Sequence, residues 1–440
     1  MKRAIAMAAA AALVLTMATA CSKTPASSSS SSSSSGISSS SSGPAENVTI
    51  TYACWDSNEA KGLQVMANEF HAKNPSITVK LQVSDWENYW TQLDAAASGG
   101  ALPDTFWMHS NYIYKYATNG MLMDLGNDIK SSSNVDMSKF PTGLVNIYKI
   151  NGKQYCIPKD YDTIALWYNK TMFDKAGVKY PDESWTWTDL ANAAKKLTVK
   201  NAGGKTTQYG ILAPMRDQEG FYNFIYQNGG TVLKEANGKK TSGYDDPKTV
   251  DAMKFYTGLV KDGYSQQEYG DAERAQDIEN GLDAMGFFGS WNLSGFESND
   301  YMKKNFDCAV LPKGPTGTQA SIYNGLGEAI AYNTKHPDAA WKWVEYLSSK
   351  DGMYRSGQLG VAIPAYEGAS DEWIKTNTTF NIKTYPEMIQ YGVILPYSNT
   401  TGIWENQVYE QIKGAFNGTK TVDQACKDAA NVMNESLAIE

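Results

Sequence analysis

Residues that could carry out catalysis are few in this sequence. The three histidines, His71, His109 and His336, show no metal-ligand spacing, and no G-x-S-x-G motif occurs. Asp160 and Asp162 come closest to a pair of carboxylates, but alternate residues of an extended segment point to opposite faces. We therefore expect no catalytic centre, no metal site and no cofactor. A solvated turn and a ligand contact both stay open for Asp160, whereas a ligand contact is favoured for Asp162.

Aromatic residues with a polar handle are abundant, with 12 Trp and 27 Tyr against 13 Phe. Such side chains suit sugars, because C–H faces of a sugar stack on rings while its hydroxyls need fixed donors and acceptors. Several stand beside polar residues at predicted strand ends or turns: Trp55-Asp56-Ser57-Asn58-Glu59, Trp107-Met108-His109-Ser110-Asn111, Gly289-Ser290-Trp291 and Tyr397-Ser398. A single aromatic is more often a core residue, but the recurrence predicts a polar cleft that binds rings.

The elements that must position these residues alternate between strands and helices. Residues 48–55 read as a buried strand, residues 63–70 carry a helical apolar stripe, and residues 77–83 alternate as a second strand. Strand, helix and strand in this order predict a βαβ unit with parallel strands. Further along, residues 152–170 read as two strands joined by the polar segment 159–162. We interpret that segment as a hinge between two lobes that also faces a ligand.

The amino-terminal residues resemble an export signal. Lys2 and Arg3 precede an uncharged stretch that ends at Ala20, and Cys21 follows. Small residues before a cysteine resemble a bacterial lipoprotein cleavage site, so we expect Cys21 to be lipidated; a simple cleaved signal is the alternative. The serine-rich tract that follows is typical of a flexible tether.

Charge, hydropathy and cysteine content limit the kinds of protein that this chain could be. Without Lys2 and Arg3, 37 of the 39 basic residues remain against 47 acidic ones, and an acidic surface repels nucleic acid. No apolar run after the signal approaches the length of a membrane span. The four later cysteines allow three pairings, and we expect most to be reduced core residues.

A set of short motifs in a fixed order resembles a known family over residues 48–437. The motifs are Trp86-x-x-Tyr89-Trp90-x-x-Leu93, Pro103-Asp104-x-Phe106-Trp107-Met108, Asn119-Gly120-x-Leu122-x-Asp124-Leu125, Tyr168-Asn169-Lys170, Phe173-x-x-Ala176-Gly177, Ser184-Trp185-Thr186-Trp187, Gln227-Asn228-Gly229-Gly230, Met285 with Gly289-Ser290-Trp291, Leu311-Pro312, Ala339-Ala340-Trp341-Lys342 and Ile363-Pro364-Ala365. In this order they resemble the extracellular solute-binding proteins of ABC importers, specifically the sugar-binding, maltose-binding-protein-like group.

The resemblance implies an α/β fold of the periplasmic-binding-protein type II kind, with two lobes, hinge-crossing segments and a central ligand cleft. It implies a signal peptide over residues 1–20 and a lipidated cysteine with a tether over 21–46. It places residues 47–161 and 310–347 in lobe 1, and residues 162–309 and 348–440 in lobe 2. A chain of this length is too long for a single core, which agrees with two lobes.

Carried over residue by residue, the resemblance also implies a set of ligand contacts. They are Trp55, Asp56, Glu59, His109, Asn111, Asp162, Trp291, Tyr397 and Trp404, with Glu219 and Tyr222 as further candidates. The chain departs from the family pattern where Met108, Asn111 and Tyr112 replace an aromatic and two charged residues. The resemblance therefore supports sugar binding without maltodextrin specificity.

The function implied is capture of a mono- or oligosaccharide and its delivery to an ABC permease, by a monomer anchored through Cys21 to the outer face of the bacterial membrane. Three alternatives stay open. A secreted glycoside hydrolase needs two carboxylates facing one bond, about 5 to 9 Å apart. The second alternative keeps the fold and changes the solute to a polyamine, a phosphate ester or a metal ion. A polyamine would require a more acidic cleft, a phosphate ester would require more arginine, and a metal ion would require a His or Tyr cluster. The third is a lipid-anchored adhesin without transport.

Overall fold

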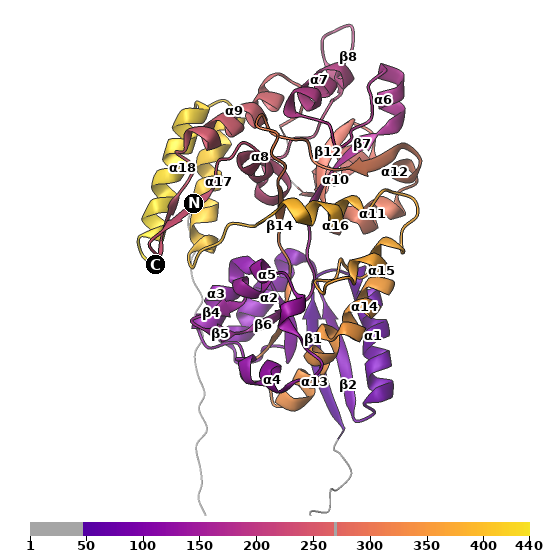
Figure 1. The fold of residues 1–440 in the computed structure, drawn as a ribbon, viewed down its shortest axis with the longest axis vertical. Coiled ribbons are helices and arrows are strands. Elements are labelled where there is room, and N and C mark those ends of the chain that lie inside the picture. The colour runs from indigo at the N-terminus through magenta and orange to yellow at the C-terminus, as the bar shows by residue number, and fades with distance from the viewer. Residues whose placement is uncertain (1–46, 268–270) are drawn as a thin grey trace, which may run out of the picture. The chain divides into compact units, whose positions relative to one another are not determined.

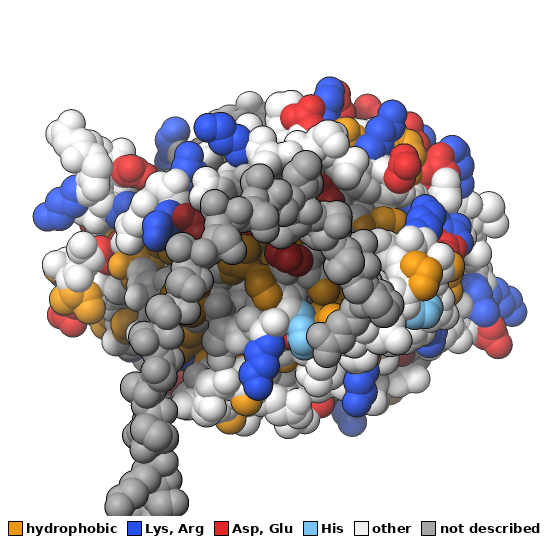
Figure 2. All heavy atoms as spheres, turned by 90° about the horizontal axis from the view of Figure 1, so that it is seen from below, with side chains coloured by type: hydrophobic (Ala, Val, Ile, Leu, Met, Phe, Trp, Pro, Cys, Tyr) orange, Lys and Arg blue, Asp and Glu red, His pale blue; other side chains and the backbone are white. Residues whose placement is uncertain are grey.

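The computed structural model describes residues 47–267 and 271–440 of the chain. Within these residues two separate β-sheets, each with its own helices, define two α/β lobes (Figure 1). The predicted signal, Cys21 and the serine tract lie outside the described residues. On the face drawn in Figure 2, basic and acidic side chains are interspersed.

The first lobe is built on a five-stranded sheet with the strand order β2-β1-β3-β15-β6. Strands β1 (Val48–Cys54), β2 (Ile77–Val83) and β3 (Thr105–Met108) are parallel, whereas β15 (Gly327–Ile330) runs antiparallel to both β3 and β6 (Cys156–Pro158). Helix α1 (Glu59–Lys73) connects β1 to β2 and buries the apolar stripe that the sequence predicted. The predicted βαβ unit is therefore confirmed.

The other elements of the first lobe cover this sheet, and Figure 1 shows α1, α13 and α14 beside β1 and β2. They are α2 (Trp86–Ser98), α3 (Ser110–Thr118), α4 (Gly126–Ser131), a single turn at Met137–Lys139, α5 (Thr142–Ile147), the hairpin of β4 (Lys149–Ile150) and β5 (Lys153–Gln154), α13 (Pro337–Ser348), α14 (Lys350–Gln358) and α15 (Ser370–Ile374).

The second lobe is built on a three-stranded antiparallel sheet, in the order β12 (Met285–Gly289), β7 (Ile164–Asn169) and β13 (Phe306–Ala309). All six residues of the central strand β7 are buried, as a strand covered on both faces requires. Helices α9, α17 and α18 pack side by side in this lobe (Figure 1).

The remaining elements of the second lobe include several short helices and hairpins. They are α6 (Lys170–Ala176), α7 (Trp187–Leu197), β8 (Val199–Lys200), β9 (Thr206–Gln208), a turn at Asp217–Phe221, α8 (Tyr222–Gln227), β10 (Leu233–Ala236), β11 (Lys239–Ser242), α9 (Pro247–Lys261), α10 (Asp271–Glu279), a turn at Ser290–Asn292, α11 (Leu293–Ser298), α12 (Asp300–Asn305), α16 (Thr384–Met388), a turn at Ile389–Tyr391, α17 (Thr401–Phe416) and α18 (Val422–Leu437).

Segments that cross between the lobes lie where the sequence placed the hinge, and also later in the chain. Residues 159–163 connect β6 of the first sheet to β7 of the second. A second crossing runs alongside, because the backbone of Asp162 pairs with that of Asn324. It follows β14 (Ser321–Tyr323), which pairs with β16 (Gly392–Ile394), and leads into β15.

Contacts near residues 310 and 348 show on which lobe each segment packs. The backbone N–H of Trp187 donates to the carbonyl of Lys313, so the segment after residue 310 first packs on the second lobe. Helix α14 packs against α1 and α13 of the first lobe. The division of the chain into lobes at residues 310 and 348 stays a prediction.

Two expectations about the chain as a whole can be compared with the described residues. Cys54, Cys156, Cys308 and Cys426 are buried and no disulfide joins them, which places them in the core; that they are reduced stays a prediction. In the part of the chain that the structure describes, no helix combines the length and the apolar character needed to cross a bilayer.

Candidate ligand-binding cleft

A cavity of about 290 Å³ lies between elements of the two lobes. The first lobe contributes the loop from β1 to α1 and the segment after α14; the second contributes the turn after β12 and helix α11. The lining residues are Asp56, Asn58, Glu59, Asp162, Ser290, Trp291, Leu293, Ser294, Glu297, Leu359, Gly360, Val361, Ala362, Ile363, Trp373 and Thr376. Its walls thus combine carboxylates and hydroxyls with aromatic and aliphatic surface.

Trp291 and Asp162 meet at the end of β12. The Asp162 Oδ1 atom accepts a hydrogen bond of 2.5 Å from Ser290 Oγ, and the Trp291 side chain is 37% exposed although it lines a cavity. Gly289 permits this turn, because a Cβ atom there would stand 2.0 Å from the Trp291 ring. The turn therefore presents an aromatic face and a carboxylate to the same space.

The loop from β1 to α1 supplies the opposite wall. Asp56 Oδ1 accepts hydrogen bonds from the backbone N–H groups of Asn58 and Glu59, at 2.7 and 2.9 Å, which fixes the first turn of α1. Asn58 Nδ2 donates to Ser294 Oγ of α11 at 3.1 Å. This hydrogen bond joins the two lobes across the rim of the cavity.

A buried lysine connects this wall to the hinge. Lys159 Nζ lies 2.7 Å from Glu59 Oε2 and 2.5 Å from Asp160 Oδ2, and it sits 4.1 Å above the Trp107 ring. Asp160 Oδ1 also accepts from the backbone N–H of Leu326 at 2.7 Å. Asp160 is therefore a buried structural residue, and the solvated-turn interpretation was wrong because its main-chain partner, Leu326, lies far away in the sequence.

Carboxylates outnumber ammonium groups around this hinge, and their pKa values reflect it. Burial raises the pKa of Asp162 to about 7 and that of Glu59 to about 8, with neighbouring carboxylates adding to the shift and Lys159 opposing it. Burial likewise raises the pKa of Glu328 to about 7, although its Oε1 atom accepts from Tyr52 at 2.8 Å. Charge in the cleft thus changes near neutral pH.

Asn111 and His109 are not among the residues that line this cavity. Asn111 Nδ2 donates to Glu405 Oε2 of α17 at 3.1 Å, a second hydrogen bond between the lobes. His109 Nδ1 accepts from the backbone N–H of Asn111 at 3.2 Å, and Asn324 Nδ2 lies 2.9 Å from His109 Nε2. Burial lowers the pKa of His109 to about 4, so the ring is neutral at pH 7.

The comparison with protein families decides the class of this protein. The model of the bacterial extracellular solute-binding proteins matches residues 56–354. The chain belongs to this family. It is a family of binding proteins rather than of enzymes, in agreement with the scarcity of catalytic signatures in the sequence.

Relatives and solved structures of other solute-binding proteins cover most of the chain. The maltodextrin-binding protein MdxE of Bacillus subtilis is 24% identical over 388 residues, 85% of this chain and 87% of the relative. The diacetylchitobiose binding protein DasA of Streptomyces coelicolor is 26% identical over 310 residues, 68% of this chain and 69% of the relative.

The structure of Lmo0181 from Listeria monocytogenes in complex with cycloalternan is 26% identical, with a TM-score of 0.78, and the alignment covers 89% of this chain and 99% of that one. The sugar-binding protein MalE of Xanthomonas citri matches with a TM-score of 0.73 at 21% identity, over 89% and 98% of the two chains. The predicted two-lobe fold is confirmed.

Several residues that the sequence proposed as contacts lie away from the cavity of this solute-binding protein. Tyr222 is in the second-lobe core, where its hydroxyl accepts from Tyr244 at 3.1 Å. Trp404 is fully buried and donates from Nε1 to Ser398 Oγ. Tyr397 is half-buried beneath the ammonium of Lys240, 5.1 Å from its ring centroid. None of the three lines the cavity.

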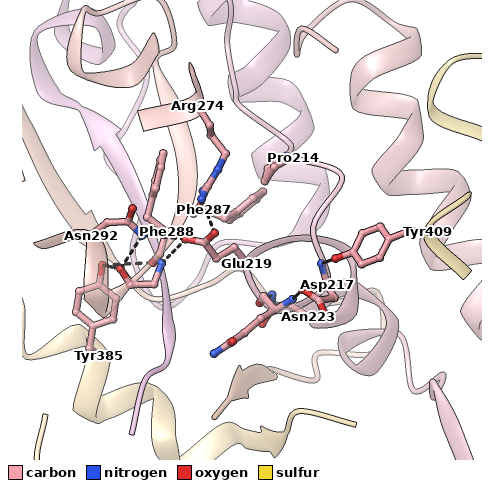
Figure 3. A network of polar contacts seen from close by, with 12 residues as sticks. Pro214, Asp217, Glu219, Asn223, Arg274, Phe287, Phe288, Asn292, Tyr385 and Tyr409 are labelled. Atoms are coloured by element: carbon pink, nitrogen blue, oxygen red, sulfur yellow. Dashed lines mark hydrogen bonds and ion pairs between the residues drawn. The ribbon is translucent and has the colours of Figure 1, made fainter. Parts of the chain in front are cut away.

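Glu219 and Trp55 support the cleft from behind. Glu219 Oε1 accepts from the backbone N–H of Gly289 at 2.9 Å and from Asn292 Nδ2 at 3.0 Å, while Oε2 pairs with Arg274 (Figure 3). This buried ion pair therefore holds the turn that carries Trp291. The Trp55 ring packs against Trp86, Tyr89, Trp90 and Trp107, which makes it part of an aromatic cluster.

Sequence reasoning missed several residues of the cleft. Ser294 and Glu297 are polar positions of helix α11 that no motif marked, and the segment 359–363 lines the cavity with aliphatic side chains and backbone. Glu405 does not line the cavity but accepts the cross-lobe hydrogen bond from Asn111, and it had a usable signal, because it follows Trp404 directly and therefore points about 100° away from that buried face of the helix.

Proposed function

We propose that this solute-binding protein captures a mono- or oligosaccharide outside the cell and delivers it to an ABC transporter permease. The observation that carries the proposal is the exposed Trp291 ring beside the Asp162 carboxylate, in a cavity that both lobes line. A ring beside hydrogen-bonding oxygens suits a sugar, whose C–H face is apolar while its rim carries hydroxyls. The ligands in the names of similar proteins and structures, maltodextrin, diacetylchitobiose and cycloalternan, belong to this chemical class.

In this proposal the sugar holds the two lobes together. Asp56 and Glu59 on the first lobe, with Asp162 at the hinge, accept hydrogen bonds from hydroxyls, while Trp291 on the second lobe contacts the ring face. Only the closed arrangement gives the sugar both sets of contacts, so binding populates it. The cross-lobe hydrogen bonds described above add to the same closed arrangement. The permease would then recognise the closed protein.

The anchor completes the proposal. Lipidation at Cys21 would keep the protein on the outer face of the bacterial membrane, and the serine-rich tract would allow the binding domain to reach the permease. We propose that the protein acts as a monomer. We also propose that it binds no nucleic acid, because its net charge of −8 repels a phosphate backbone.

A thermal-shift screen of the purified protein against mono- and oligosaccharides tests the proposal. A ligand that binds only the folded state stabilises it by about 2.7 kcal/mol at a hundredfold excess over Kd. The shift should disappear in Trp291→Ala and in Asp162→Asn. Tyr391→Ala, which removes an aromatic ring that is also 37% exposed but does not line the cavity, is the matched control and should keep the shift. A shift with a peptide or an ion but with no sugar would reject carbohydrate binding and keep the fold.

A further inference from the structure

We propose that the carbohydrate held in this cavity carries a positively charged amino group, so that the ligand is an amino sugar or a short amino-sugar oligomer. This inference rests on the proposed function and specifies the ligand of the same site. Its basis is the charge of the cavity lining, the pairing of the nearest basic residues, and the exposed face of Trp291.

All charged side chains that line the cavity are acidic. Asp56, Glu59, Asp162 and Glu297 contribute carboxylates, and no Lys, Arg or His is among the described residues that line it. They come from different elements: the loop before α1, α1 itself, the hinge and α11. The site is defined by the cavity between the lobes, and the four carboxylates determine the charge of its lining.

The nearest buried basic side chains already have carboxylate partners. Lys159 lies between Glu59 and Asp160, at 2.7 and 2.5 Å, and Arg274 pairs with Glu219 at 2.5 Å. At the hinge, the single ammonium of Lys159 therefore faces the two carboxylates of Glu59 and Asp160, and Asp162 adds a third carboxylate. Burial and the neighbouring carboxylates raise the pKa of both Asp162 and Glu59, whereas Lys159 lowers it. The carboxyl groups of the unliganded cavity therefore resist full ionisation.

An ammonium group matches this lining better than a hydroxyl does. A hydroxyl can donate one hydrogen bond and leaves the net charge of the cavity unchanged, whereas an ammonium supplies three donors, no acceptor and one positive charge. Hydrogen bonds between charged partners are about twice as strong as neutral ones. The Trp291 ring can also interact with a cation through its face. Removing water from several carboxylates during closure favours a ligand that brings its own positive charge.

The size of the site limits the ligand to a small one. A cavity of about 290 Å³ is at the lower end of the range of small-molecule sites, about 300 to 1,000 Å³. One or two sugar rings are therefore the appropriate probes.

Isothermal titration of the purified protein with a matched series of sugars provides the test. Glucosamine, N-acetylglucosamine and glucose differ at one position, as an ammonium, an acetamide and a hydroxyl; their β-1,4-linked dimers repeat the comparison at two rings. Putrescine supplies ammonium groups without a sugar. At pH 7 and low salt we expect an ammonium member to bind at least tenfold more tightly than both neutral counterparts. The preference should shrink at 0.5 M salt, because salt screens charge interactions.

A charge-removing variant sharpens the experiment. Glu297→Gln keeps the side-chain shape and an oxygen for the hydrogen bond from Asn377 but removes one negative charge from the cavity. It should reduce the preference for the ammonium sugar over its neutral counterparts severalfold. Glu410→Gln removes the same charge from an exposed position of α17 that does not line the cavity, and it should leave the preference intact.

The outcomes separate this inference from the proposed function. If glucose or N-acetylglucosamine, as monomer or dimer, binds as tightly as its ammonium counterpart, the inference is overturned and the proposed function stands. If putrescine binds while every sugar fails, carbohydrate binding itself is rejected. If no member of either class binds, both the inference and its basis are rejected. Equal losses of preference in Glu297→Gln and Glu410→Gln would show that overall charge, and not the cavity, produces the effect.

Discussion

Replacement of Lys159 by methionine tests whether the hinge depends on one buried ammonium. Only 6% of the Lys159 side chain is exposed, and its Nζ atom bonds to Glu59 and Asp160. Lys159→Met leaves these two carboxylates without their shared partner, and breaking a buried pair in this way costs about 3 to 5 kcal/mol. The contact of the ammonium with the Trp107 ring is lost as well.

The cost should depend on pH in a defined direction. Burial already raises the folded-state pKa of Glu59 to about 8, and without Lys159 that pKa rises further above its unfolded value. For an acid with a raised folded pKa, stability is present at low pH and is lost as the pH increases through that pKa. We therefore expect a larger loss at pH 8, where Glu59 ionises in the folded wild type, than at pH 5, where Glu59 is protonated in the folded protein.

Urea unfolding followed by tryptophan fluorescence, at both pH values, measures these free energies. Lys139→Met is the matched control: it breaks the exposed pair of Lys139 with Glu367, at 2.9 Å, and such pairs contribute about 0 to 1 kcal/mol. The reasoning is refuted if Lys159→Met costs no more than this control at pH 8. It is also refuted if the loss is the same at pH 5 and pH 8.

Three further predictions concern stability and closure. Because the folded pKa values of Asp162 and Glu328 are raised to about 7, these groups should make the free energy of unfolding fall between about pH 4.5 and 7, by about 1.4 kcal/mol per pH unit for each, and contribute no further change above about pH 8; urea titrations across this range check it. Trp404→Ala should destabilise the protein by about 3 to 5 kcal/mol, measured by urea unfolding, because the side chain is fully buried, while the folded fraction keeps its solute affinity. Asn58→Ala and Asn111→Ala each remove a cross-lobe hydrogen bond, worth about 0.5 to 1.5 kcal/mol, so each should weaken solute binding by about twofold to tenfold in calorimetric titrations.

Each of these predictions has a clear contrary result. A free energy of unfolding that rises from pH 4.5 to 7 would contradict raised carboxyl pKa values in the folded protein. Loss of solute affinity in Trp404→Ala with unchanged stability would place that tryptophan in the site. Unchanged solute affinity in both asparagine variants would mean that the cross-lobe hydrogen bonds do not favour closure.

The sequence predicted those features that depend on local pattern. Helix α1 and its flanking strands follow from apolar spacing, and the hinge at 159–162 follows from a polar segment between two β-rich runs. The role of Asp160 could not be predicted in this way, because its main-chain partner Leu326 is 166 positions away in the sequence. Likewise, the partner of Lys159 on α1, Glu59, is 100 positions away.

The candidate site was harder to predict than the fold because burial decides what an aromatic residue does. Trp291 and Trp404 both stand beside polar residues in the sequence, yet one is 37% exposed in the cavity and the other is fully enclosed. Tyr222 likewise belongs to the core. Adjacent residues of a helix also differ in what they contact. Trp404 is buried in the second lobe, whereas the next residue, Glu405, accepts a hydrogen bond from Asn111 of the first lobe.

The most direct test of the central claim compares three variants against the carbohydrate that binds best in the screen. Isothermal titration should show that Trp291→Ala and Asp162→Asn lose most of their affinity, because both side chains line the cavity between the lobes. Tyr222→Phe should bind like the wild type, because that hydroxyl is bonded inside the second lobe. The account is contradicted if Tyr222→Phe abolishes binding while Trp291→Ala and Asp162→Asn keep it.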